Sequence, residues 1–326
     1  MSRRVFVYLC LLMALVAGPW PVTVARAQTP TTVSIALNWF KNVEFAGIWA
    51  AEEHGWWAQA GLRVTARAFD GTNDPTLLVG AGKITFGIHD GASVIIARAA
   101  RVPIKAVWAS GQQSPFAFIT MPKSGIKTAR DFKGKRMGFA ADGRYVLDTM
   151  LGAVGLTEAD VTPVVVGQDP SVLLAGRVDA YLGYLTDEPI EMAERYHIQV
   201  NVIPASQYGY DFYSDVLFTT DSTIQQHPAL VRTVVAIMDR GWKYALAHPT
   251  EIARYVVPRL DSKDTLAQQT TELRALAGLA TRPGAPIGSM TATRWQDGIR
   301  LLLKYHKIPA SVAASSVFTT QFLPAR

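Results

Sequence analysis

Polar and aromatic residues that could bind a ligand occur where several apolar runs of the sequence end. In the stretch LNWFKNVEFAG, at residues 37–47, an apolar run ends in Asn38 and Trp39, and Asn42 follows before a helical pattern begins. An indole ring at this place can stack on a planar ligand or cover the top of a hydrophobic core, and the stretch leaves both roles open. The candidate ligand-binding residues are Asn38, Trp39, Asn42, His89, Asp90, Ser110, Asp142, Gly143, Asp187, Glu188, Tyr208 and Tyr210.

A pair of carboxylates, Asp187 and Glu188, follows one of the later apolar runs. Such a pair could perform general acid–base catalysis, or it could accept hydrogen bonds from the amino groups of a ligand. Alternatively, Asp187 would cap a helix and Glu188 would lie in its first turn, a reading that Pro189 favours. Asp90, next to His89, has the same two alternatives of binding and capping.

Asp142 and Gly143 come just before a helical pattern, and Tyr208 and Tyr210 flank a glycine. Free N–H groups at a helix start can bind an anion or a polar ligand atom, although an ordinary tight turn fits the same residues. Tyrosine combines an aromatic face with a hydroxyl, which suits a bound ring and ordinary packing equally.

Sequence motifs of common catalytic sites are absent. The chain has no G-x-S-x-G, Walker, HExxH or GxGxxG motif. Its six histidines are not paired at the spacing of metal ligands, so no metal site is predicted. The single cysteine, Cys10, excludes a disulfide within the chain. We therefore predict no catalytic residue, no cofactor and no enzymatic activity.

The N-terminus predicts export. MSRR is followed by the apolar run VFVYLCLLMALVAG, and Ala25-Arg26-Ala27 offers a signal-peptidase site, so cleavage is predicted after Ala27. An uncleaved anchor is the alternative, and Arg3-Arg4 leaves the choice between the general and the twin-arginine export route open. Without residues 1–27, 29 basic and 26 acidic residues remain, too small an excess to predict nucleic-acid binding. The expected location is the periplasm.

Short apolar strands alternate with helical patterns over most of the chain, whose 326 residues suit one large or two medium domains. This alternation is typical of α/β lobes with parallel sheets. Residues 77–86 and 172–180 repeat one unit of apolar helix, glycine, basic residue and new strand, which indicates two similar lobes. Strands are predicted at residues 33–37, 63–68, 85–89, 105–109, 136–140, 161–166, 179–184 and 199–203, and helices at 45–59, 74–80, 91–100, 230–246, 252–257, 265–279 and 291–305.

Most of the candidate residues follow these strands at their carboxyl ends. When two parallel-sheet lobes face each other, such ends line a single cleft. Trp39 and Asn42 are then expected to form one wall of that cleft.

An ordered series of segments between residues 33 and 249 resembles the NMT1/THI5-like (SsuA/THI5-like) solute-binding proteins. The segments are LNWFKN, AGIWAAEEHGWWAQAGL, VGAGKITFGI, ARAARVPIKAV, SGIKTARDFKGKRMGF, LAGRVDAYLGYLTDEPIE, QYGYDFYSDVLFTT and GWKYALAHP. The resemblance implies a type II periplasmic-binding-protein fold, in which residues 31–118 and 217–326 form lobe 1 and residues 119–216 form lobe 2. It also implies a protein that closes on a small-molecule ligand and delivers it to an ABC permease in the inner membrane. A monomer is expected. A periplasmic sensor is the alternative to transport.

Members of this family bind thiamine pyrimidine precursors, riboflavin, or anions such as sulfonates and nitrate. Pyrimidine binders resemble W-x-P-N-T-x-H-x-G in the first loop, where this chain has Lys41, Val43 and Phe45 in place of Pro, Thr and His. Their N-E-P motif corresponds to residues 187–189, which keep the glutamate. This glutamate would accept a hydrogen bond from an aminopyrimidine.

The resemblance thus implies an aromatic heterocycle as the ligand, with a thiamine pyrimidine precursor expected first and riboflavin second. A sulfonate or nitrate ion would need cationic or helix-start donors, for which Arg144 and the Gly143 amide are the obvious supply.

Some members are enzymes that make the thiamine pyrimidine from pyridoxal phosphate and histidine. Their active lysine corresponds here to His89 and their following histidine to Ser93. Their cysteine-rich iron-binding run corresponds to residues 208–213, which contain no cysteine. These departures imply that the chain does not share the enzyme activity.

Overall fold

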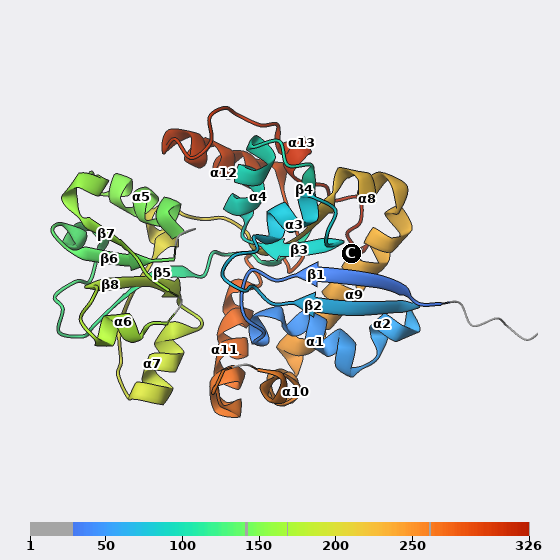
Figure 1. The fold of residues 1–326 in the computed structure, drawn as a ribbon, viewed down its shortest axis with the longest axis horizontal. Coiled ribbons are helices and arrows are strands. Elements are labelled where there is room, and N and C mark those ends of the chain that lie inside the picture. Colours follow the sequence, from blue (N-terminus) through green and yellow to red (C-terminus); the bar gives the residue numbers. More distant parts are fainter. Residues whose placement is uncertain (1–28, 141–142, 168, 261, 326) are drawn as a thin grey trace, which may run out of the picture.

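The computed structural model describes residues 29–140, 143–167, 169–260 and 262–325, which form two α/β lobes (Figure 1). The predicted export signal lies outside these residues. Within the described part of the chain, no helix combines the length and the apolar character needed to cross a membrane.

The first sheet has five strands in the order β2-β1-β3-β10-β4. Its central strands are buried along their whole length, as expected when helices cover both sides of a sheet. The strands are β1 (Thr31–Ala36), β2 (Leu62–Arg67), β3 (Phe86–His89), β4 (Ile104–Gly111) and β10 (Ser214–Thr220).

The second sheet has five strands in the order β7-β6-β8-β5-β9. The strands are β5 (Phe116–Thr120), β6 (Arg136–Phe139), β7 (Thr162–Val165), β8 (Ala180–Tyr184) and β9 (Asn201–Pro204).

Both sheets are mixed, whereas the alternation of strands and helices predicted parallel sheets. β1 pairs in parallel with β2 and β3, but β10 runs antiparallel to both β3 and β4. In the second sheet, β5 runs antiparallel to β8 and β9. The reversed strands are the ones by which the chain passes between sheets: β5 follows β4 of the first sheet, and β10 follows β9 of the second. Because these passages are not helical crossovers, nothing forces the strands to be parallel.

The predicted lobe boundaries, after residues 118 and 216, fall inside β5 and β10. We propose boundaries in the segments before these strands, at residues 112–115 and 209–213, so that each strand stays whole in its sheet.

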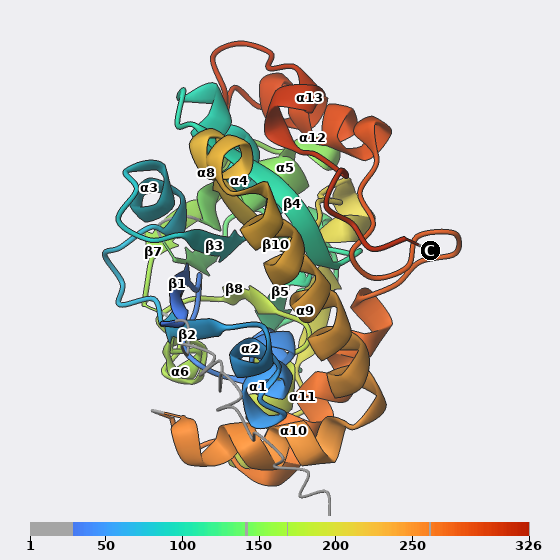
Figure 2. The ribbon, with the colours of Figure 1, turned by 90° about the vertical axis from the view of Figure 1, so that its right-hand side faces the viewer.

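Helices cover both sheets and form most of the chain after residue 220 (Figure 2). They are α1 (Ala46–Glu53), α2 (Trp56–Gln59), α3 (Pro75–Gly80), α4 (Gly91–Ala99), α5 (Arg144–Ala153), α6 (Ser171–Leu174), α7 (Glu188–Tyr196), α8 (Asp221–Gln226), α9 (Pro228–Ala247), α10 (Pro249–Val256), α11 (Leu266–Leu279), α12 (Ala292–Lys304) and α13 (Ala314–Val317). The 3₁₀ helices are η1 (Val43–Phe45), η2 (Ala129–Phe132), η4 (Glu158–Asp160), η5 (Ala205–Tyr208) and η6 (Val257–Arg259).

The helix predicted over residues 45–59 is broken in two. Gly55 has a φ of 66°, a left-handed conformation that ends the first helix, and α2 starts directly after it. The long helix α9 packs against α1 with its backbone in direct contact (Figure 2). A Cβ atom at Gly241 would lie 2.1 Å from the carbonyl oxygen of Gly47, so only glycine allows this approach.

Candidate functional site

A cavity of about 50 Å³ lies between the two sheets, at the carboxyl ends of β1, β3, β6 and β8. Its lining contains many of the predicted binding residues: it consists of Asn38, Trp39, His89, Asp90, Phe116, Ala140, Gly143, Tyr181, Leu182, Gly183, Tyr184, Asp187 and Glu188. A second cavity, of about 270 Å³, shares Trp39, Asp187 and Glu188 with the first and is also lined by Asn42. The first cavity is small beside the roughly 300–1,000 Å³ typical of ligand sites, so the two lobes are drawn together in this structure.

Two aromatic rings from different lobes face each other across this cleft. The indole of Trp39, after β1, and the phenol of Tyr184, at the end of β8, have centroids 6.4 Å apart and planes inclined by 18°. A planar ring held in contact with both would need a spacing of about 7 Å. The rings of Phe116 and Tyr184 meet edge to face, with centroids 4.9 Å apart at 87°, which fixes the orientation of the Tyr184 ring.

The carboxylates Asp187 and Glu188 lie beside these rings, at the start of α7. The side chain of Asp187 makes no capping hydrogen bond to the helix and instead lines both cavities. Glu188 is 4% exposed, and one carboxyl oxygen accepts a hydrogen bond of 2.6 Å from the backbone N–H of Tyr184. Burial raises the pKa of Glu188 to about 7, although this hydrogen bond acts in the opposite direction.

A second carboxyl pair, Glu44 and Asp215, is buried close to Tyr184. Burial raises the pKa of Glu44 well above its ordinary value, and the neighbouring charge of Asp215 adds to the effect. The two side chains hydrogen-bond to each other, which lowers the pKa of Asp215 against the effect of burial and leaves it at about 6. A hydrogen bond between two carboxyl groups requires a proton on one of them, so burial and this pairing favour a protonated carboxyl group here.

Asn38 lies between this pair and the cavity. Its Nδ2 is 3.4 Å from Oε1 of Glu44, and its buried Oδ1 has no hydrogen-bond partner among the described residues. A buried amide oxygen without a partner is costly, and a ligand N–H would satisfy it.

Asp90 caps α4, and capping was one of the two roles predicted for it. Its carboxylate accepts hydrogen bonds from the backbone N–H groups of Ala92 (2.8 Å) and Ser93 (3.0 Å). It also accepts a hydrogen bond of 3.0 Å from the hydroxyl of Tyr145, which lies on α5 of the second lobe. Asp90 therefore links the two lobes directly. Burial alone would raise the pKa of Asp90, but the hydrogen bond and charge of His89 outweigh it and lower the pKa.

Carboxyl groups also meet across the lobes at α7 and α11. Glu272 on α11 accepts hydrogen bonds from Gln268 (2.9 Å) and Gln269 (2.7 Å), while burial raises its pKa to about 8, with Glu188 adding to the rise. Burial and the charge of Glu272 likewise raise the pKa of Asp187 well above its ordinary value. This arrangement of the lobes therefore holds carboxyl groups of both lobes close together.

Cations are scarce at this site. Among the described residues, none that lines the smaller cavity is a lysine or an arginine. Arg144, which the sequence offered as a donor to anions, pairs with Glu158 instead. Lys41 and Arg195 line only the second cavity, where Arg195 pairs with Glu191 at 3.0 Å. The chemistry of the cleft is thus aromatic and acidic.

The other predicted residues lie outside the smaller cavity. Asn42 caps η1, because its side-chain oxygen accepts a hydrogen bond of 2.9 Å from the backbone N–H of Glu44. The Ser110 hydroxyl donates to the backbone oxygen of Asp215 at 3.3 Å. The Tyr208 hydroxyl accepts a hydrogen bond of 3.1 Å from the backbone N–H of Ala129, away from the cleft.

Tyr210 is fully buried in the core, where its ring packs against Phe116, Tyr145 and Phe212. Asp142 lies outside the described residues. The binding role of each candidate residue remains a prediction.

Sequence reasoning missed Tyr184, Glu44 and Asp215. Tyr184 carries the same signal as Trp39, an aromatic residue at the carboxyl end of a strand, and that signal could have identified it. Glu44 and Asp215 stand beside or within apolar segments, VEFAG and SDVLFTT, where a buried acid is unexpected.

Comparison with known proteins places this chain in one family. Residues 42–252 match the family described as NMT1/THI5 like. The riboflavin-binding protein RibY of Chloroflexus aurantiacus is 25% identical over 98% of this chain and 96% of that protein. A formylaminopyrimidine-binding protein of Halalkalibacterium halodurans is 22% identical over 91% and 92% of the two chains. Other relatives are named 4-amino-5-hydroxymethyl-2-methylpyrimidine phosphate synthase.

Solved structures share the fold. The alkanesulfonate-binding protein SsuA of Xanthomonas axonopodis pv. citri, bound to MOPS, aligns with a TM-score of 0.69 and 17% identity over 89% of this chain and 99% of that chain. The two lobes with mixed five-stranded sheets are therefore the periplasmic-binding-protein fold. The chain belongs to the NMT1/THI5-like family.

Proposed function

We propose that the chain is the periplasmic solute-binding protein of an ABC importer, and that its ligand is a small aromatic heterocycle carrying N–H donors. The observation that carries this proposal is the pair of facing rings, Trp39 and Tyr184, beside buried carboxyl groups. A thiamine pyrimidine precursor fits this lining best and riboflavin is second.

The ligand ring would lie between the two aromatic side chains. Its amino or ring N–H groups would donate to Glu188, Asp187 and the free amide oxygen of Asn38. The names of the riboflavin-binding and formylaminopyrimidine-binding relatives support a heterocycle of this kind. A sulfonate or nitrate ion would instead meet carboxylates without a lysine or arginine among the described residues of the smaller cavity, which argues against it.

Binding would act on the position of the lobes. A ring touching both Trp39 and Tyr184 favours the closed arrangement, in which the two side chains can hold it together. The lobes must separate to admit the ligand, since the smaller cavity measures only about 50 Å³. The closed form would then dock on a permease in the inner membrane, after export directed by the N-terminal residues.

A pyrimidine-synthase activity, as named for several relatives, is not part of this proposal. His89 stands where those enzymes have their active lysine. In the structure, its Nδ1 lies 2.9 Å from the backbone nitrogen of Asp90 and 3.0 Å from Oδ2 of Asp90, at the start of a capped helix. An imidazole in that place cannot form the Schiff base that a lysine forms with pyridoxal phosphate.

A thermal-shift screen of the purified protein tests the proposal. The compounds are hydroxymethyl and formylamino pyrimidines, thiamine, riboflavin, pyridoxal phosphate, taurine, alkanesulfonates and nitrate. A ligand at 100 times its Kd should add about 2.7 kcal/mol to the free energy of unfolding. We expect a rise in Tm with pyrimidines or riboflavin that disappears in Trp39→Ala. A rise with sulfonates or nitrate alone would refute the heterocycle, and a rise with pyridoxal phosphate alone would favour the enzyme.

A further inference from the structure

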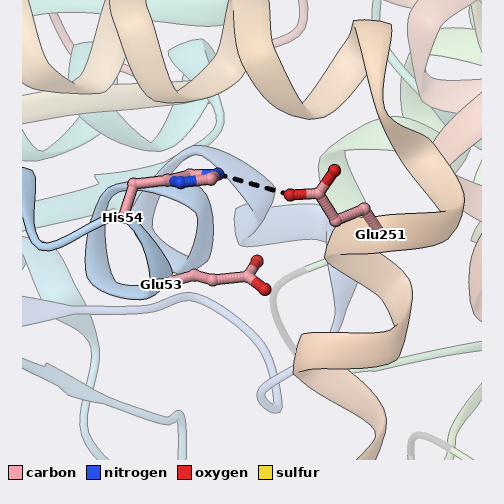
Figure 3. Close-up of side chains that lie close together, drawn as sticks. All are labelled: Glu53, His54 and Glu251. Carbon is pink, nitrogen blue, oxygen red and sulfur yellow. Dashed lines mark ion pairs between the residues drawn. The ribbon is translucent and has the colours of Figure 1, made fainter.

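We propose that Glu53, His54 and Glu251 form a binding site for a divalent transition-metal ion such as Zn²⁺, separate from the cleft. Glu53 is the last residue of α1, His54 follows it, and Glu251 lies in the first turn of α10 (Figure 3). The fold thus brings together residues that are far apart in the sequence, which is why histidine spacing did not indicate the site. None of the three lines either cavity of the cleft.

The three side chains converge on one point. Each offers one ligand atom, and these atoms all lie within 4.8 Å of one another. Nε2 of His54 points at Oε1 of Glu251 across 3.4 Å (Figure 3). This nitrogen is buried and makes no hydrogen bond among the described residues, so its contact with Glu251 leaves its hydrogen-bonding capacity unused.

Neighbouring side chains hold two of these ligands in place. The His54 ring stacks on Trp56, with centroids 5.1 Å apart, and meets Tyr244 edge-on at 4.4 Å. The Tyr244 hydroxyl donates a 2.8 Å hydrogen bond to Oε1 of Glu251. Fixed rings and hydrogen-bonded carboxylates around the ligands are the features that orient metal sites.

The electrostatics of the site favour a cation. Glu52 and Glu53 end α1, where the helix dipole is negative, and no basic residue lies in that last turn. A metal ion would offset the repulsion between Glu53 and Glu251 and the unfavourable position at the helix end.

One imidazole and two carboxylates form a ligand set that suits Zn²⁺. His248 is a candidate fourth ligand, because its Nδ1 lies 3.8 Å from Oε2 of Glu251; water could also complete the site. The bound ion would join the end of α1 to the start of α10 and so stabilise lobe 1.

Isothermal titration of the metal-free, untagged protein with ZnCl₂ tests the site. We expect one Zn²⁺ per chain and a higher Tm in its presence. Glu53→Gln, His54→Ala and Glu251→Gln should each weaken binding by about tenfold or more. Glu53 is exposed, so Glu53→Gln should fold normally even if His54→Ala does not. Glu194→Gln and His227→Ala replace exposed residues elsewhere and should bind Zn²⁺ like the unaltered chain.

Three results would overturn the proposal: no Zn²⁺ binding, binding unaffected by Glu53→Gln, or binding that only Asp187→Asn removes. The last result would place the ion in the cleft.

Discussion

Replacing Glu188 by glutamine should stabilise the ligand-free protein above neutral pH while weakening ligand binding. Glu188 is 4% exposed, and in the cleft its carboxyl group accepts a hydrogen bond from the backbone N–H of Tyr184. Glutamine has the shape of the protonated acid and can accept the same hydrogen bond, but it cannot ionise. The substitution therefore removes a buried charge and replaces one of the two acceptor oxygens by an NH2 group, which cannot accept from the proposed ligand.

The size of the effect follows from the pKa of Glu188, which burial raises from 4.5 to about 7. Because the folded state binds the proton more tightly than the unfolded state, stability from this group is present below pH 4.5 and is lost as the pH rises through 7. At about 1.4 kcal/mol per pH unit, the loss is about 3 kcal/mol across this window. Glutamine contributes no such loss, so the variant and the unaltered protein should differ little at pH 5 and by about 3 kcal/mol at pH 8.

Urea unfolding at pH 5, 6, 7 and 8 measures this difference without ligand. Glu194→Gln is the matched control, because Glu194 is an exposed glutamate on the same helix, and its pH dependence should follow that of the unaltered protein. The reasoning fails if Glu188→Gln keeps the full loss of stability between pH 5 and 8, or if it is less stable than the unaltered protein at pH 8. Titration with the ligand found in the screen should show a Kd at least about tenfold higher in the variant.

Three further predictions concern the rings, the helix packing and the link between lobes. Tyr184→Ala should raise the ligand Kd by about tenfold or more and Tyr184→Phe should not, because the proposed role of the side chain is stacking; calorimetric titration compares them. Gly241→Ala should destabilise the protein by about 2 kcal/mol or more in urea unfolding, since its Cβ would meet the α1 backbone at 2.1 Å, whereas Gly278→Ala, with open space around it, should not. Tyr145→Phe removes the hydrogen bond to Asp90 between the lobes and should raise the radius of gyration of the ligand-free protein in small-angle scattering; an unchanged radius would contradict this role.

Much of the fold could be predicted from periodicity. β1, β2, β6 and α9 lie within two residues of their predicted bounds, because their apolar patterns are strong and local. β5 and β10 were not among the predicted strands, and their directions could not be predicted either. The residues of FAFIT and SDVLFTT do not indicate a strand direction, and their pairing depends on strands far away in the sequence.

The candidate site was predictable where a residue follows a strand. Trp39, Asp187 and Glu188 come together because the strands before them end at the same cleft. For Tyr210, the residue types alone were misleading. A tyrosine beside a glycine suits a cleft, but Gly209, with a φ of 88°, turns the chain so that the Tyr210 ring enters the core. The Glu44–Asp215 pair depends on contacts between η1 and β10, which no local pattern reveals.

A crystal structure with 4-amino-5-hydroxymethyl-2-methylpyrimidine, or with riboflavin if that compound gives the larger thermal shift, tests the central claim most directly. The account predicts the ligand ring between Trp39 and Tyr184, with a nitrogen donor within hydrogen-bonding distance of Glu188 or Asp187. A ligand bound elsewhere, or one held in the cleft without contact to either ring, would contradict it.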